Sequence, residues 1–76
     1  MLIERQGKNG FVNFDKVVLI DTTVDTEGYA NVFVRYENGG MVVLGQYRTE
    51  EKADAVVQEI VEKYENEART KTYKMP

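Results

Sequence analysis

The sequence TEEKADAVVQEIVEKYENEA, residues 49–68, carries the strongest structural signal in the chain. Its apolar residues are spaced three and four apart, the pattern of an amphipathic α-helix that buries one stripe. These residues are Ala53, Val56, Val57, Ile60, Val61, Tyr64 and Ala68. Thr49 is a favourable N-cap, and Glu50 and Glu51 then lie at the positive end of the helix dipole. We therefore expect one helix over residues 50–68.

The chain before this helix has the pattern of antiparallel strands. Apolar and β-branched residues concentrate in residues 2–6, 11–14, 16–24, 29–36 and 41–48. Asn9-Gly10 and Asn38-Gly39 fall between such runs, and an Asn-Gly step accepts the positive φ angles of a tight hairpin turn. Short connections pair consecutive strands antiparallel. The sequence thus predicts an α+β fold: an antiparallel meander of about five β-strands (residues 2–48) followed by one C-terminal amphipathic α-helix packed on the sheet.

Residues 69–76 follow the predicted helix as a tail. Tyr73 and Met75 would lie on one side of an extended segment, because side chains alternate along a strand. The tail is therefore either a sixth strand or a frayed end. A chain of 76 residues has room for one domain, residues 1–76, composed of sheet, helix and tail.

The composition excludes most catalytic machinery. The sequence contains no Cys, no His, no Ser and no Trp. A Ser-His-Asp triad, a Cys nucleophile, a His general base and a Cys/His metal site are therefore impossible. Most acidic residues fall in turns or on the exposed side of the predicted helix, where they are solvated charges. We expect a protein that is not an enzyme, with no catalytic residue, no metal site and no cofactor.

The charge balance constrains the partners. With 13 acidic and 10 basic residues, the net charge is −3, whereas the surface of a nucleic-acid-binding domain is usually basic. The longest strictly apolar run, residues 17–20, is far too short to span a membrane. Residues 1–5 also lack the features of a signal peptide. We therefore expect a cytoplasmic protein that binds neither membranes nor, in general, nucleic acid.

The predicted sheet has two apolar faces, and one helix covers only one of them. Counting alternate residues assigns to the helix side Val18, Ile20, Val32, Val34, Val42 and Leu44. The opposite side then carries Val17, Leu19, Phe33, Met41, Val43 and Tyr47, with Asp21 and Arg35 among them. A solvated antiparallel face is usually polar, so either the sheet curls to bury both faces or a partner covers the second. We expect a homo-oligomer. Its expected interface residues are Phe33, Met41, Val43 and Met75.

Arginine and tyrosine residues suggest a ligand site. An Arg beside a Tyr suits an anion that carries an aromatic base, because it offers charge-assisted hydrogen bonds and stacking. The alternative is that the tyrosines pack across strands and the basic residues are solvated. The candidate ligand-binding residues, from two neighbouring predicted strands and the basic tail, are Arg35, Tyr36, Tyr47, Arg48, Arg69 and Tyr73.

Three short strings carry a resemblance that covers most of the chain. VNFDKV (residues 12–17), LGQYRTEEKA (44–53) and YKMP (73–76) resemble a pattern in short uncharacterised proteins of phages and prophages of Gram-positive bacteria such as clostridia. The strings mark a strand entry and a strand-to-helix junction, so they relate to the fold more than to an activity. The resemblance implies a phage accessory protein that acts by binding, in the cytoplasm of the host cell.

These observations lead to three functional hypotheses. The first is a non-enzymatic binding protein that counters host defence by sequestering a small anionic, nucleotide-type ligand at an oligomer interface. The second is a protein–protein inhibitor of a host defence enzyme, similar to an anti-CRISPR protein, that acts through an apolar surface or through the acidic helix face of Asp54, Glu59, Glu62 and Glu65. The third, disfavoured by the net charge, is a small nucleic-acid-binding regulator that uses the basic tail.

Overall fold

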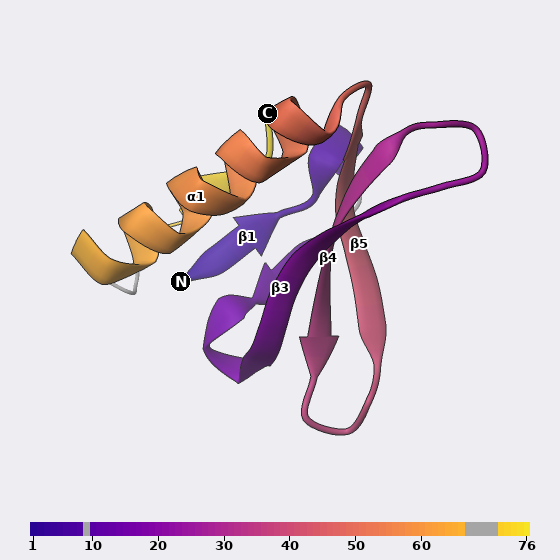
Figure 1. Cartoon of the computed structure of the whole chain (residues 1–76). Helices are drawn as coiled ribbons and strands as arrows, with labels where there is room; N and C mark the ends of the chain where they lie inside the picture. Colours follow the sequence, from indigo (N-terminus) through magenta and orange to yellow (C-terminus); the bar gives the residue numbers. More distant parts are fainter. Residues whose placement is uncertain (9, 67–71) are drawn as a thin grey trace.

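Six strands and one α-helix occur in the computed structural model, which describes residues 1–8, 10–66 and 72–76. In chain order, they are β1 (Leu2–Glu4), β2 (Phe11–Asn13), β3 (Val17–Val24), β4 (Ala30–Tyr36), β5 (Met41–Tyr47), α1 (Glu50–Asn66) and β6 (Thr72–Lys74) (Figure 1). Two short 3-10 turns, η1 (Gln6–Lys8) and η2 (Phe14–Lys16), connect β1 to β2 and β2 to β3. The hairpin of β3 and β4 extends away from the helix (Figure 1).

The strands form two three-stranded sheets, with the orders β2-β1-β6 and β3-β4-β5. All hairpin neighbours pair antiparallel, as expected from their short connections. The predicted α+β class with one C-terminal helix is therefore confirmed. The expected sheet of about five strands is corrected to six strands in two sheets, because η2 separates β2 from β3 and the first hairpin pairs with β6 instead.

The tail supplies the sixth strand, one of the two alternatives that the sequence left open. β6 pairs parallel with β1, with Tyr73 beside Ile3, and the backbone N–H of Met75 donates to the carbonyl of Glu4 at 3.1 Å. Parallel pairing needs a long crossover between the strands. Here the whole second sheet and α1 lie between β1 and β6 in the chain, so this requirement is met.

The helix begins as its sequence predicts. The hydroxyl of Thr49 accepts a hydrogen bond from the backbone N–H of Lys52 at 3.1 Å, which confirms Thr49 as the N-cap. α1 is described as far as Asn66, so the predicted end at residue 68 lies outside the described residues. Asn9, of the first predicted Asn-Gly turn, lies outside them too.

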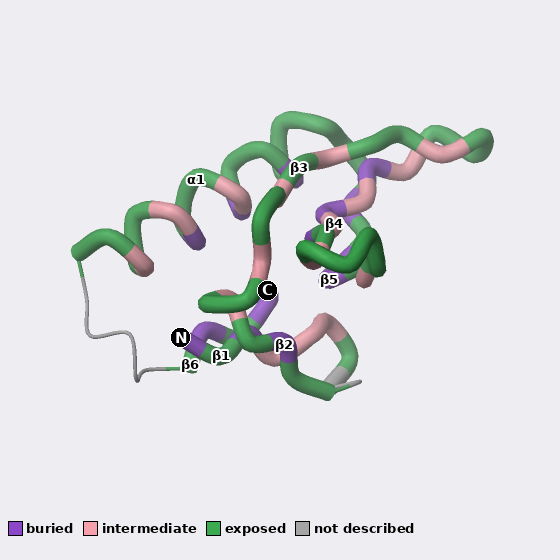
Figure 2. The backbone as a smooth tube through the Cα atoms, turned by 90° about the horizontal axis from the view of Figure 1, so that it is seen from below, coloured by how far each residue is buried: buried purple, intermediate pink, exposed green. Residues whose placement is uncertain are grey.

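The core lies between α1 and the two sheets. Figure 2 shows the buried positions of the helix and strands turned toward a common interior. Ala53, Val56 and Ile60 are the buried residues of α1. The largest fully buried side chains come from the helix and from both sheets; they are Ile3, Leu44, Ile60, Val32 and Val34. One continuous cluster thus holds the two sheets together.

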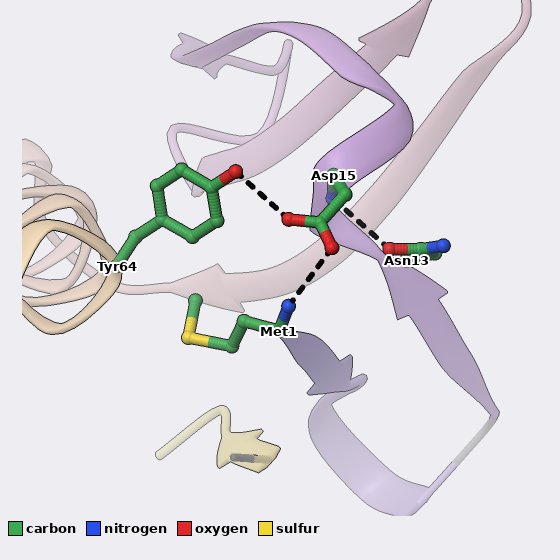
Figure 3. A network of polar contacts seen from close by, with 4 residues as sticks. All are labelled: Met1, Asn13, Asp15 and Tyr64. Atoms are coloured by element: carbon green, nitrogen blue, oxygen red, sulfur yellow. Dashed lines mark hydrogen bonds and ion pairs between the residues drawn. The ribbon is translucent and has the colours of Figure 1, made fainter. Parts of the chain in front are cut away.

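A polar network ties the later part of α1 to the chain between β2 and β3 (Figure 3). The Asp15 carboxylate accepts from the Tyr64 hydroxyl at 2.8 Å and lies 3.4 Å from the amino group of Met1. The Tyr64 ring meets the Phe14 ring edge-on, with centroids 5.0 Å apart. The backbone N–H of Asp15 donates to the Asn13 side chain at 3.0 Å. These contacts fix the orientation of α1 relative to η2.

Candidate functional site

Two β-bulges determine which side chains reach each face of the sheet β3-β4-β5. Val18 is an extra residue in β3, and Leu44 is an extra residue in β5. Because side chains alternate with a period of two, one extra residue reverses the assignment beyond it. Val17 and Tyr47, expected on the second face, therefore pack on the core. Val18, expected under the helix, is 62% exposed. Simple alternation was wrong at these three positions.

The face of this sheet that points away from α1 has two adjacent rows of side chains, each crossing all three strands. Directly opposite residues share a face, and the register gives the rows as Leu19, Arg35, Met41 and Asp21, Phe33, Val43. We call these six residues the open face. Met41 is 55% exposed, Leu19 42% and Val43 37%, while Phe33 is half-buried. The structure therefore places Phe33, Met41 and Val43 together on one apolar surface.

The open face carries one cation and one anion among its four apolar side chains. Arg35 donates from Nη1 to the Gly39 carbonyl at 3.3 Å, and its Nη2 lies 4.0 Å from the sulfur of Met41. Asp21 accepts from the backbone N–H of Thr22 at 2.8 Å. Both side chains are exposed, and no ion pair among the described residues involves either of them. A guanidinium has five donors, so Arg35 retains N–H groups for an external carboxylate or phosphate.

The other expected ligand residues of β4 and β5 do not gather around Arg35. Arg35 pairs with Met41, whereas Tyr47 pairs with Ala30 at the opposite end of the two strands. That offset of five residues corresponds to about 17 Å. Arg48 follows Tyr47 and is exposed there, and Tyr36 is half-buried against the core. Within one chain, these four residues do not form a single site. Arg69 lies outside the described residues.

Tyr47, Tyr73 and Met75 are core residues, exposed by 8%, 7% and 8%. The Tyr47 hydroxyl donates to the main-chain oxygen of Pro76 at 3.0 Å, and the Tyr73 hydroxyl donates to the Glu59 carboxylate. Burial raises the pKa of Tyr47. Burial, together with the hydrogen bond and the negative charge of Glu59, raises the pKa of Tyr73 well above its ordinary value. Both hydroxyls are thus used inside the molecule, away from the open face.

Two residues at the edge of β5 were not identified from the sequence. Arg5 donates from Nε to the Val43 carbonyl at 2.9 Å, and the Gln6 side chain accepts from the backbone N–H of Gln46 at 2.8 Å. The amide of Gln6 also donates to the main-chain oxygen of Pro76 at 3.0 Å. These bonds cover backbone groups that an edge strand otherwise exposes. Partners 38 and 40 residues apart leave no local signal in the sequence.

Comparisons with known proteins assign no family and no function to this chain. The chain matches no protein-family model, no curated protein and no solved structure. In the part of the chain that the structure describes, no acidic residues cluster in a way that could hold a metal ion. The described helix is also too short and too polar to cross a membrane. What the open face offers chemically is an exposed apolar surface with a single guanidinium and a single carboxylate.

Proposed function

We propose that this protein is a non-enzymatic binding protein and that the open face is its binding surface. The observation that carries the proposal is Arg35, exposed on a sheet face among Leu19, Phe33, Met41 and Val43. Arginine, methionine and aromatic side chains are enriched where proteins bind partners. Apolar surroundings also strengthen a contact between charged groups. Such a face is suited to recognition, because its side chains include no nucleophile paired with a base.

The ligand class that suits this face is a small anion with an aromatic part, such as a nucleotide. A phosphate would bind the free donors of Arg35, and a base would stack on the neighbouring Phe33 ring. Phe33 therefore takes the stacking role that the sequence suggested for Tyr36 and Tyr47. If the chain is a phage accessory factor, as its resemblance implies, sequestering a nucleotide second messenger would counter host defence.

Calorimetry with a panel of cyclic mono- and dinucleotides and cyclic ADP-ribose isomers tests this proposal. We expect one panel member to bind, and Arg35→Ala to weaken that binding roughly tenfold or more, because hydrogen bonds to charged groups contribute about 1.5–3 kcal/mol. Arg48→Ala is the matched control, since it removes the same charge at the far end of β5 and should bind normally. No heat from any panel member, or equal affinity in both variants, would contradict the small-ligand function.

A second candidate is a protein–protein inhibitor that docks through the same apolar residues. The exposed Met41 and Leu19 favour this version over an acidic one. On α1, Asp54 accepts from the Thr22 hydroxyl at 3.2 Å and Glu59 accepts from Tyr73. Two of the four acids proposed to imitate nucleic acid are therefore engaged within the chain. A silent nucleotide panel, combined with a stable complex with a purified host defence enzyme that Met41→Asp abolishes, would select this candidate.

A further inference from the structure

We infer that a second copy of this chain can cover the open face, forming a two-fold symmetric dimer in which Arg35 of each copy binds Asp21 of the other. The inference rests on the proposed role of the open face as a binding surface. A separate observation, the placement of one positive and one negative side chain on that face, supports the chain itself as the partner.

Arg35 and Asp21 lie close together on the open face but do not pair within one chain. Asp21 is directly opposite Phe33 across β3 and β4, and Arg35 is two residues further along β4. Such diagonal neighbours are about 7–8 Å apart. Neither residue forms an ion pair with another described residue. Each chain thus presents a positive and a negative group side by side. A second chain can pair with both if its own two groups lie in the opposite order.

A two-fold axis supplies that reverse order. In a two-fold interface, residue i contacts residue j of the partner and j contacts i. When the axis lies between the two sheets, parallel to them, and crosses the line from Arg35 to Asp21 at right angles and at its midpoint, each guanidinium lies over the partner's Asp21. One operation therefore creates two identical ion pairs. A surface carrying a single charge would repel its own copy, so the presence of both signs specifically favours self-association.

The apolar residues of the open face complete the interface. Leu19 and Met41 flank Arg35 in one row, and Phe33 and Val43 follow Asp21 in the other. Two sheets packed face to face lie about 10 Å apart and interdigitate their side chains. In that arrangement, the four apolar side chains of each copy lose water together and surround both ion pairs. Charged pairs that are shielded from water attract more strongly.

The size of the face predicts a weak dimer. Three strands about 4.8 Å apart, with about six residues at roughly 3.3 Å each, span roughly 14 by 20 Å. That footprint, about 280 Å² per copy, is smaller than the roughly 600 Å² per partner of the smallest stable interfaces, so the association is weak and transient. We therefore expect a dissociation constant in the micromolar range. Because a ligand on Arg35 and a second copy would share one surface, binding of the ligand should shift the equilibrium toward the monomer.

Sedimentation equilibrium over a concentration series tests the dimer, with charge-reversed variants as the decisive step. Arg35→Asp places two carboxylates opposite each other in a dimer, and Asp21→Arg places two guanidinium groups there. Each variant alone should dimerise at least about tenfold more weakly than the natural chain, since like charges across an interface are costly. An equimolar mixture of the two variants should form heterodimers, because opposite charges then face each other at both positions.

Matched controls separate this result from a general effect of charge. Arg48→Asp and Glu62→Arg make the same charge changes at exposed positions away from the open face, and both should dimerise like the natural chain. A natural chain that stays monomeric at every concentration overturns the inference. So does a dimer that both reversed variants retain, or a mixture that remains monomeric. These outcomes concern dimerisation alone. Nucleotide binding, the proposed function, is tested separately by calorimetry.

Discussion

The two faces of the sheet β3-β4-β5 have similar apolar content and opposite surroundings. On the inner face, Val32, Val34 and Leu44 are at most 1% exposed, because α1 and the strands of the other sheet cover them. On the open face, Leu19 and Met41 are 42% and 55% exposed. The difference shows that apolar side chains identify surfaces suited to burial, while the covering segments decide which surface is buried within the chain. In the proposal above, the open face is the one that a partner covers.

The largest effect is expected from the inner face. Leu44→Ala removes a fully buried side chain and leaves a cavity, so the free energy of unfolding should fall by about 2–5 kcal/mol. Urea denaturation followed by circular dichroism measures the change. A loss below about 1 kcal/mol would mean that the inner face is less tightly packed than the structure shows.

A second effect concerns the bulge that turns Tyr47 inward. A Cβ added at Gly45 would lie 3.0 Å from the Tyr47 hydroxyl oxygen and 3.3 Å from side-chain atoms of Gln6 and Met75. Gly45→Ala should therefore lower the free energy of unfolding by about 1–3 kcal/mol through overpacking. In a thermodynamic cycle, Tyr47→Phe should relieve part of that loss by removing the closest atom. If the changes in the free energy of unfolding caused by Gly45→Ala and Tyr47→Phe simply added, the close contact between residues 45 and 47 would be contradicted.

The buried hydroxyl of Tyr73 predicts a loss of stability at alkaline pH. Its pKa is raised in the folded state by burial and by Glu59, so the unfolded chain ionises first, near about pH 10. The stabilising contribution is complete below that pH and is lost as pH rises toward the folded pKa. Thermal unfolding measured from neutral to alkaline pH should show a decline that is smaller in Tyr73→Phe. Identical pH profiles of the two proteins would contradict the raised pKa.

The smallest effect on stability is expected on the open face, where Leu19→Ala makes the same change of side chain as Leu44→Ala. Leu19→Ala alters a side chain that is 42% exposed, so the free energy of unfolding should change by less than about 1 kcal/mol. The same variant should weaken dimerisation, which sedimentation measures. If Leu19→Ala destabilised the monomer as much as Leu44→Ala, the two faces would not differ in the way described above.

The sequence predicted the elements better than the arrangement of the sheets. The helix stripe and the Thr49 cap depend on local spacing, and both were correct. The inward position of Tyr47 depends on the extra residue Leu44, and no local pattern marks a bulge. The pairing of β6 with β1 joins residues some 70 positions apart, which strand propensity cannot indicate.

The candidate site was predicted in part. Alternation along the strands correctly placed Phe33, Met41 and Val43 on one surface with Arg35. It could not show that Tyr47 and Arg48 lie at the far end of the antiparallel pair, because that depends on the register of β4 and β5. The ligand and the oligomeric state remain predictions, argued from Arg35 and Asp21.

Methyl-resolved NMR during dilution tests the central claim, that the open face is the binding surface, most directly. The account predicts concentration-dependent shifts for the methyl signals of Leu19, Met41 and Val43, and the same signals should move when a panel ligand binds. The methyl signals of Val32, Leu44 and Ile60, on the buried side, should stay in place. Constant signals from the open face, both on dilution and with every ligand, or shifts confined to other parts of the chain, would contradict the claim.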